Sequence, residues 1–349
     1  MSIKKSMSLL VIILLVVSVS SVAFGSVAGT VTDESSDTDE SSDPNILAGN
    51  TLYVGGTGGD NYTKIQYAID NTTDGDTVFV YNNSSPYEEN VIVNKSITLT
   101  GEDKETTVIN GTGSGNTVNV EVDNVEVQGF SITYGDSAGI YVGGNDANIT
   151  NNNIYGNSEG LDFSGSDSNF ISDNDLWDND WGFDIYSSSY NVFRNNSVEV
   201  KDSEGGFYFG SDSLVNDIDT SNTVNGVSVL VVGGRDNVTV EDVNAVLPEK
   251  VEATNYGLIN IYNCDNVTVT NATTANHANH GIYIAGDNTN TLVEKSTSYN
   301  NTDAGIQLQG SGATVSNNTV HNNSEGLDFS WADSNFISDN DLWDNDWGF

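Results

Sequence analysis

The stretch SEGLDFSGSDSNFISDNDLWDNDWGF, residues 158–183, decides the fold because it returns almost letter for letter at residues 324–349. The two copies differ at only two positions and lie 166 residues apart. Each copy has a Gly that opens an alternating apolar strand, and then shorter apolar segments set off by Asn and Asp. Repeats of this kind indicate units that stack on one another, so the architecture follows from the repeat before any single residue is considered.

The same pattern recurs along the chain in units of about 20 to 24 residues. Strands this short cannot bury a face alone. Stacking at about 4.8 Å, the spacing of strands in a sheet, buries one continuous core and pairs each backbone group with the units above and below. The sequence therefore predicts an all-β parallel β-helix over residues 51–349, with a short amphipathic helix at Thr63–Asp70 behind a Thr63 N-cap.

Two columns of asparagine appear when the units are aligned on their apolar residues. Identical amides stacked at the sheet repeat can hydrogen-bond to one another and to the turn backbone, so we expect structural Asn ladders. Glycine at each strand entrance fits a corner that needs a positive φ or a close backbone approach. The first column is Asn152, Asn174, Asn196, Asn318 and Asn340, and the second is Asn157, Asn179, Asn301, Asn323 and Asn345.

The leading segment predicts export. Residues 1–28 have two lysines, an apolar run and then small residues, which is typical of a signal peptide; the alternative is a retained membrane anchor, although the run is short for a span of about 20 residues. Residues 29–50 are acidic and Ser/Thr-rich, which predicts a disordered linker. At the other end the chain stops at Phe349 just after a strand has begun, so we expect the β-helix to be truncated there.

The charge balance excludes some partners. Ten Lys and Arg against 50 Asp and Glu give a formal net charge of -40, which repels nucleic acid phosphates and anionic membrane surfaces. The acidity has two interpretations: a solvated surface adapted to high salt, or carboxylates that hold divalent cations. The single cysteine, Cys264, excludes an internal disulfide. About fourteen Asn-x-Ser/Thr sequons fit a secreted or cell-surface protein, with membrane contact only through the leading segment if it is uncleaved.

The start of the globular region, residues 53–111, reads YVGGTGGDNYTKIQYAIDNTTDGDTVFVYNNSSPYEENVIVNKSITLTGEDKETTVING. It resembles the entry of right-handed parallel β-helix proteins of the pectin-lyase-like superfamily, in particular the NosD-like group with carbohydrate-binding and sugar-hydrolase (CASH) repeats. Acidic, sequon-rich relatives of this type are similar to archaeal cell-surface proteins. The resemblance implies right-handedness, export and a role for Thr63–Asp70 as the N-terminal capping helix, but it does not choose among lyases, hydrolases, epimerases and binding proteins.

The densest carboxylate cluster lies in the repeated stretch. A lyase would need such acids for Ca²⁺ and a nearby Arg or Lys to abstract a proton, while the plain alternative is a solvated acidic face. No cofactor other than Ca²⁺ is expected. The catalytic candidates are Asp173, Asp175, Asp178, Asp180 and Arg194, and the Ca²⁺ candidates are Asp175, Asp178 and Asp180.

Tryptophans are the candidate sugar contacts, because aromatic faces suit the apolar C–H faces of sugars. These are Trp177, Trp181, Trp343 and Trp347. We therefore expect an exported β-helix that binds a polysaccharide or another surface glycan, or that acts as a scaffold and self-associates in a surface layer. The first alternative is a lyase or hydrolase acting on uronate-containing glycans. The second is a copper-site accessory protein using His277, His280 and His321, since the NosD-like group takes its name from such a protein.

Overall fold

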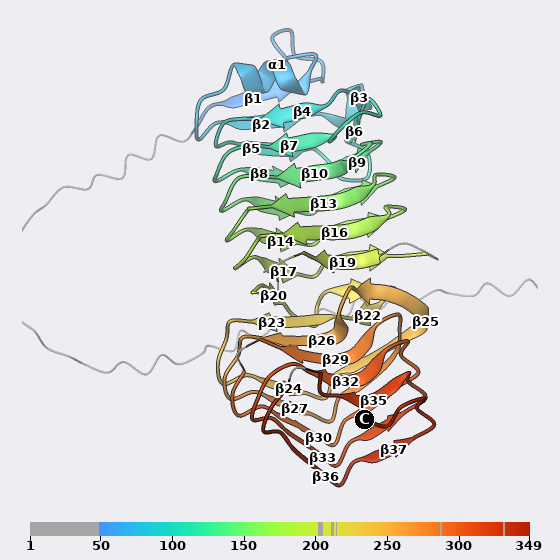
Figure 1. The fold of residues 1–349 in the computed structure, drawn as a ribbon. Coiled ribbons are helices and arrows are strands. Elements are labelled where there is room, and N and C mark those ends of the chain that lie inside the picture. The colour runs from blue at the N-terminus through green and yellow to red at the C-terminus, as the bar shows by residue number, and fades with distance from the viewer. Residues whose placement is uncertain (1–48, 202–204, 211–212, 214, 287, 331) are drawn as a thin grey trace, which may run out of the picture. The chain divides into compact units, whose positions relative to one another are not determined.

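Short strands stacked in coils make up almost the whole of the part of the chain that the structure describes (Figure 1). This confirms the all-β solenoid that the repeat predicts. The expected signal segment and nearly all of the expected linker lie outside the described residues. Among the residues that the structure describes, no helix is both long and apolar enough to cross a membrane. The computed structural model describes residues 49–201, 205–210, 213, 215–286, 288–330 and 332–349.

Among the described residues there is one α-helix, α1 (Ile65–Asp70), which follows the first strand and buries its apolar face. The predicted Thr63 N-cap is wrong: Lys64 occupies the cap position and makes no side-chain capping bond. The Glu89 carboxylate accepts the N–H groups of Ile65 and of the following residue instead, at 2.8 and 3.2 Å. A carboxylate from the next coil thus satisfies the free donors of the first helical turn. A 3-10 turn, η1 (Asn82–Ser84), follows later in the chain.

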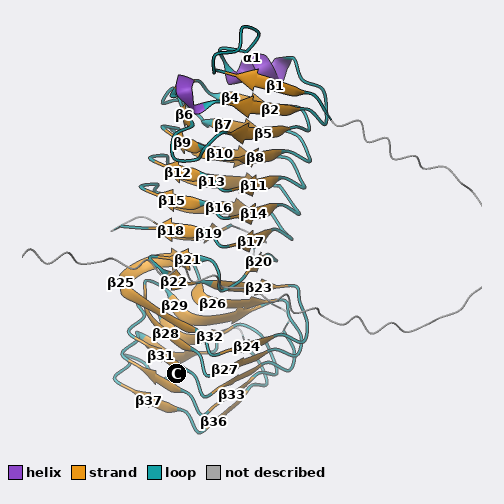
Figure 2. Cartoon of the chain, turned by 180° about the vertical axis from the view of Figure 1, so that it is seen from behind, coloured by secondary structure: helices purple, strands orange, loops and turns teal. Residues whose placement is uncertain are grey.

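The first stack of coils, β1 to β22, contributes three strands per coil to three sheets (Figure 2). Strands at the same place in successive coils pair in parallel, so inward side chains align; Leu161 lies opposite Phe183, for example, and both are fully buried. The strands are β1 (Thr51–Val54), β2 (Thr77–Val80), β5 (Thr98–Gly101), β8 (Glu126–Gln128), β11 (Asn148–Thr150), β14 (Phe170–Ser172), β17 (Val192–Arg194) and β20 (Asp217–Ile218) in the 13-stranded sheet; β4 (Val91–Val93), β7 (Val118–Val120), β10 (Ala138–Val142), β13 (Glu159–Ser164), β16 (Trp181–Tyr186) and β19 (Gly205–Phe209) in the 11-stranded sheet; and β3 (Tyr87–Glu88), β6 (Val108–Asn110), β9 (Ser131–Thr133), β12 (Asn153–Tyr155), β15 (Asp175–Trp177), β18 (Ser197–Glu199), β21 (Thr223–Val224) and β22 (Val227–Ser228) in the 8-stranded sheet.

A hairpin then reverses the chain. β21 and β22 pair antiparallel around Asn225 and Gly226, which both have positive φ, 49° and 74°. Asn-Gly with positive φ at both positions is the type I′ turn that a two-residue hairpin favours. Gly226 therefore sits in a hairpin turn and does not open a coil. β23 (Leu230–Gly233) continues from the hairpin and pairs antiparallel with β20.

In the second stack, β23 to β37, each strand of the repeat joins a different sheet from the one that the equivalent strand joins in the first stack. Its glycine-led strands join the 13-stranded sheet, and the long β25 (Asn244–Thr254) pairs with β19 near its end and with β28 near its start. The segment 247–250 is part of β25, where the register shifts between Val246 and Val251. The remaining strands are β26 (Gly257–Tyr262), β29 (His280–Ala285), β32 (Ala304–Leu308) and β35 (Glu325–Asp328) in the 13-stranded sheet; β28 (Thr273–His277), β31 (Thr297–Tyr299), β34 (Thr319–His321) and β37 (Asp341–Trp343) in the 11-stranded sheet; and β24 (Thr239–Glu241), β27 (Thr268–Thr270), β30 (Leu292–Glu294), β33 (Thr314–Ser316) and β36 (Phe336–Ser338) in a separate 5-stranded sheet.

The reversal separates the two copies of the repeated stretch. The first copy supplies β13, β14 and β15 to the 11-, 13- and 8-stranded sheets, whereas the second supplies β35, β36 and β37 to the 13-, 5- and 11-stranded sheets. The buried side chains likewise form two clusters, one for each stack, with a few residues of the second stack joining the first cluster. Identical sequences therefore present their outward side chains on different sheets.

Buried asparagines connect the coils. The backbone N–H and Nδ2 of Asn152 both donate to Asn174 Oδ1 at 3.1 Å, and those of Asn174 donate to Asn196 Oδ1 at 3.2 and 3.0 Å. Asn174 Nδ2 also reaches the Ile149 carbonyl at 2.8 Å. The amide thus satisfies turn donors and acceptors that water cannot reach. The same bonds join Asn157 to Asn179, Asn318 to Asn340, Asn301 to Asn323, and Asn323 to Asn345.

Close approach explains the glycine at the strand entrances. Gly160 and Gly182 do not have positive φ, but a Cβ on Gly160 would lie 2.6 Å from both the Gly182 carbonyl oxygen and Leu176 Cδ2. Real Cβ atoms do not tolerate such contacts. The coils can therefore stack at this corner only where no side chain is present.

Replacing Asn174 with Ala will test the ladder. The substitution leaves the Asn152 N–H and the Ile149 carbonyl without a partner in the buried turn, so we expect a loss of about 2–4 kcal/mol in the free energy of unfolding. Asn340→Ala is the matched control, because Asn340 is only half-buried and should cost about 1–2 kcal/mol. Denaturant unfolding measures both; equal effects at the two sites would contradict the role given to burial.

Candidate functional site

Trp177 lies on the outer face of the 8-stranded sheet. In β15 the inward position is taken by Leu176, which is buried, so Asp175 and Trp177 face outward. Tyr155 of the coil above stacks on the indole with ring centroids 4.8 Å apart and planes inclined by 7°. The neighbour of Trp177 in the coil below is Glu199. The register of the sheet thus places an aromatic ring on one side of the indole and a flexible carboxylate on the other.

A pocket of about 290 Å³ opens beside this indole. Trp177, Asp175 and Glu199 line it together with Asn153, Ser197, Leu176 and Glu105. A second pocket of about 440 Å³ shares Ser197 and Glu199 with the first and extends to the exposed bulge of β25 at Pro248 and Glu249. We call these two adjoining pockets the Trp177 groove. An aromatic ring with several carboxylate, amide and hydroxyl groups around it is a surface suited to a sugar.

Two lysines pair with acids at this surface. Lys104 Nζ lies 2.8 Å from Asp175 Oδ2, and Lys201 pairs with Asp178 and lies 3.8 Å from Glu199. These pairs fix the carboxylates of Asp175 and Asp178 at the surface. They do not neutralise the groove, because Glu105, Glu199 and Glu249 add further negative charge along it.

The predicted catalytic acids do not converge with Arg194. Asp173 and Asp178 occupy exposed turns with φ of 58° and 51°, and Asp180 is also exposed. Arg194 belongs to the 13-stranded sheet and pairs with Asp217 and Asp219 at 2.5 and 3.1 Å. Among the described residues, no three His, Cys, Asp or Glu side chains form a group able to hold a metal ion. Calcium binding by the predicted acids stays a prediction with no preformed ligand set.

The other predicted tryptophans lie apart from the Trp177 groove. Trp181, in the 11-stranded sheet, meets Tyr208 edge to face at 5.2 Å. Trp343 stacks on His321 at 3.9 Å with 43% of its surface exposed, and Trp347 is 68% exposed. They therefore do not form one platform with Trp177.

The sequence analysis missed a pair of aspartates. Asp162 and Asp184 are register neighbours on the outer face of the 11-stranded sheet, in a row that continues to Tyr141 and Tyr208. Burial, with Asp184 and Glu159 nearby, raises the pKa of Asp162 to about 7, and burial also raises the pKa of Asp184. The signal was available in the sequence, since Gly-Leu-Asp-Phe and Gly-Phe-Asp-Ile in adjacent coils must stack two like charges.

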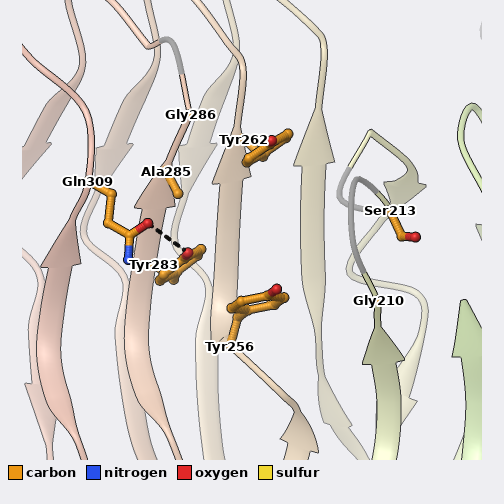
Figure 3. Close-up of a pocket in the computed structure, with 8 residues that line it drawn as sticks. All are labelled: Gly210, Ser213, Tyr256, Tyr262, Tyr283, Ala285, Gly286 and Gln309. Atoms are coloured by element: carbon orange, nitrogen blue, oxygen red, sulfur yellow. Dashed lines mark hydrogen bonds between the residues drawn. The ribbon is translucent and has the colours of Figure 1, made fainter. Parts of the chain in front are cut away.

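A second aromatic pocket, of about 290 Å³, lies where the two stacks meet (Figure 3). Tyr256 and Tyr283 stack at 4.9 Å, and the Tyr283 hydroxyl bonds to Gln309 Oε1 at 3.2 Å. Burial raises the pKa of Tyr283 to about 12, so the phenol stays protonated. Tyr262 completes the aromatic lining. The pocket has no carboxylate among its lining residues.

The three histidines proposed for copper have separate environments. His277 is fully buried: Nδ1 donates to the His280 carbonyl at 2.8 Å, Nε2 accepts the Thr254 N–H at 3.2 Å, and burial lowers its pKa to about 4. His280 Nε2 lies 3.6 Å from Asp303. His321 stacks between aromatic rings in a different strand pair. Both nitrogens of His277 are already engaged, which leaves it no position for a metal ligand.

Comparison with known proteins agrees with this architecture. The family described as "Right handed beta helix region" matches residues 97–245 and 252–349, so the chain belongs to the right-handed β-helix family.

Individual relatives are more distant or partial. A "Cell surface glycoprotein" of Methanothermus fervidus is 40% identical over 97 residues, which cover 27% of this chain and only 16% of that protein. The solved structure of Geobacillus virus E2 ORF18 superposes with a TM-score of 0.53 at 18% identity, covering 84% of this chain and 62% of that one. The catalytic domain of a GH87 alpha-1,3-glucanase in complex with nigerose has a TM-score of 0.51 at 11% identity, covering 85% and 69%. These structures show the shared fold.

Asp162→Asn will test the raised pKa. A carboxyl whose folded pKa is about 7 and whose unfolded pKa is about 3.9 lowers stability progressively as the pH rises from 4 to 7. The variant lacks this penalty, so its advantage over the native chain should be near zero at pH 4 and about 1 kcal/mol at pH 8, after allowance for solvent screening. Urea unfolding across this range measures it.

Asp328→Asn is the matched control for that experiment. Asp328 is the same position in the second copy, but its register neighbour is Gln307, whose Nε2 donates to it at 2.8 Å. Asp328→Asn therefore measures the effect of an Asp-to-Asn change at the same repeat position where no second carboxyl stands opposite. A difference at Asp162 that stayed constant from pH 4 to 8 would contradict the shift.

Proposed function

We propose that this chain is an exported cell-surface β-helix protein that binds glycans in the Trp177 groove. One observation supports this above the others. The indole of Trp177 is held by Tyr155 on one side and borders a pocket lined with polar side chains on the other, on a sheet whose rigid register fixes both. A preorganised aromatic ring with flanking hydrogen-bonding groups is what sugar recognition requires.

The size of the groove fits an oligosaccharide. Two pockets share Ser197 and Glu199 and run from Trp177 to Glu249, so more than one ring has room along the surface. Asn153 and Ser197 flank Asp175 in the register and line the same pocket as the indole, and the exposed Ser197 hydroxyl offers a donor and an acceptor to sugar hydroxyls. The indole supplies the apolar contact and the polar groups supply the orientation.

The charge of the groove selects among glycans. Asp175, Glu105, Glu199 and Glu249 outnumber the lysines that pair with them, within a chain of net charge -40. A uronate polymer would meet like charges along this surface. We therefore propose neutral or amino-substituted glycans as the ligands, in preference to uronates.

Location at the cell surface is supported by two separate features. Residues 1–28 have the composition of a secretion signal, and the archaeal relative with 40% identity over 97 residues is named a cell surface glycoprotein. A glycan-binding solenoid at that location would contact the glycans of its own or a neighbouring cell wall.

Trp177→Ala should weaken glycan binding without unfolding the protein. The side chain is only partly buried and faces away from the core, so we expect retention on a neutral glycan array to fall about tenfold, equivalent to ~1.4 kcal/mol, with an unchanged unfolding midpoint. Trp343→Ala is the matched control, since Trp343 is the same residue of the repeat placed on another sheet. Equal losses in the two variants, or none in Trp177→Ala, would remove the groove from the proposal.

A second candidate function, glycan hydrolysis or lyase chemistry, is favoured by the Asp162–Asp184 pair. Two carboxyls on adjacent strands, one with its pKa raised to about 7, can place a protonated acid beside a second carboxyl. Trp181 and Tyr208 border this row. If the pair is catalytic, a glycan that the native chain cleaves should be cleaved at least about a hundredfold more slowly by Asp162→Asn. Cleavage that Asp162→Asn leaves intact would exclude this pair.

A further inference from the structure

Exposed turns of the second stack present a set of asparagines with a shared geometry. Each begins an Asn-x-Ser/Thr sequon, each is exposed, and each has a φ between 52° and 58°. In this left-handed conformation the residue forms the convex point of the turn between two strands. The six are Asn237, Asn266, Asn271, Asn300, Asn317 and Asn322.

The Asn ladder accounts for three of these positions, because Asn300, Asn317 and Asn322 each directly precede a ladder asparagine. In Asn317-Asn318-Thr319, Asn318 is buried and its Nδ2 bonds to the Val293 carbonyl at 2.9 Å and to Asn340 at 2.9 Å. Asn317 precedes it, stands outside the core and is exposed. Thr319 then opens the next strand. The buried Asn318 thus stabilises the stack, whereas the side chain of Asn317 before it points away from the core.

Of the sequons outside this set, Asn195 in the first stack has the same arrangement, with a φ of 54° and an exposed side chain. Asn148 and Asn61 do not. Asn148 lies within β11, flanked by Glu126 and Phe170 of the adjacent coils, and is only partly exposed. Asn61 is also only partly exposed and is not among the residues with positive φ. The structure therefore sorts sequons that are indistinguishable in the sequence.

We propose that the six turn asparagines are acceptors for N-linked glycans, an inference that rests on the export part of the proposed function. The donor would be an oligosaccharide linked to a lipid phosphate. A bond forms between Asn Nδ2 and C1 of the sugar, the bond from C1 to the phosphate oxygen breaks, and the amide proton that is lost neutralises the departing phosphate. The modified amide keeps one N–H, so it can retain one hydrogen bond such as that from Asn266 Nδ2 to Asn237 Oδ1 at 2.7 Å.

Stacking limits which acceptors are used together. The N–H of Asn300 bonds to the carbonyl of His321, so Asn300 and Asn322 belong to adjacent coils about 4.8 Å apart, and Asn237 and Asn266 are adjacent in the same way. A pyranose ring with its hydroxyls is wider than this spacing. Asn271 and Asn317 are separated by the coil that carries Lys295, which leaves room for both. We expect one glycan on each adjacent pair and one on each separated member, four in all.

The test uses the full chain secreted by a host that carries out N-glycosylation, with intact mass and glycopeptide mass spectrometry as readouts. We expect modification at Asn271 and Asn317, at one member of each adjacent pair per molecule, and none at Asn61 or Asn148. Asn322→Gln should raise the occupancy of Asn300, because it removes the competing neighbour. Asn317→Gln should remove one glycan mass with little change in the unfolding midpoint, since the residue is exposed.

The outcomes separate the two proposals. A secreted, folded chain that is unmodified at both Asn271 and Asn317 would overturn the acceptor assignment while leaving glycan binding in the Trp177 groove untouched. Full occupancy of both Asn300 and Asn322 in single molecules would overturn the stacking limit. A chain that stays inside the cell would overturn export, and with it this inference.

Discussion

Satisfying the polar backbone of a tightly stacked turn is the constraint on which the rest of this structure depends. Each corner brings N–H and C=O groups into a space that water cannot enter, and a stacked asparagine amide supplies a donor and an acceptor there. Asn174 does both at once, bonding to Asn152, to Asn196 and to the Ile149 carbonyl. Because each ladder runs through several successive coils, it fixes the position of the residues on either side of it. The outward rows of side chains follow from that register.

The hairpin at Asn225 and Gly226 shows how the same sequence can serve different surfaces. Beyond it each strand of the repeat joins a different sheet, which moves the second copy of the repeated stretch away from the face that the first copy occupies. Trp177 consequently stacks on Tyr155 beside a groove, while Trp343 stacks on His321 in another sheet. Asp162 meets a second aspartate, while Asp328 meets Gln307. The chemistry of each copy depends on its neighbours in the adjacent coils and not on its own residues.

Sequence reasoning predicted what is local and periodic. The coils, the buried face of α1 and the Asn columns follow from the alternation and the spacing of residues. Alternation and spacing can each be recognised within a single segment of the sequence. Gly226 has the same local pattern as the glycines that open coils, because Val227 to Val229 continue with the same alternation, yet Asn225 and Gly226 form a hairpin turn. The Thr63 cap failed because Glu89, from a different coil, satisfies the helix donors. A third ladder, Asn169, Asn191 and Asn216, was overlooked because serine and tyrosine around it obscure the column. Arg194 likewise seemed near the acids along the chain, but it lies on another sheet.

The acidity of the chain becomes intelligible once its aspartates are located. Many lie at left-handed turn positions, such as Asp173, Asp178, Asp339 and Asp344, where a short polar side chain tolerates positive φ and the carboxylate is fully solvated. Asparagine occupies the equivalent turns elsewhere, so the turn beside the ladder accepts either Asp or Asn. The stacking of the coils does not determine which of the two is present. Where the turn carries Asp the surface gains charge, and where it carries Asn before Ser or Thr it gains a sequon. The pair at Asp162 and Asp184 departs from this rule, because its carboxyls stand on a strand, partly buried and facing each other. Partial burial next to another carboxyl disfavours the charged form of these groups. The stacking of the coils does not require acids at these two positions, so the pair is a candidate functional site.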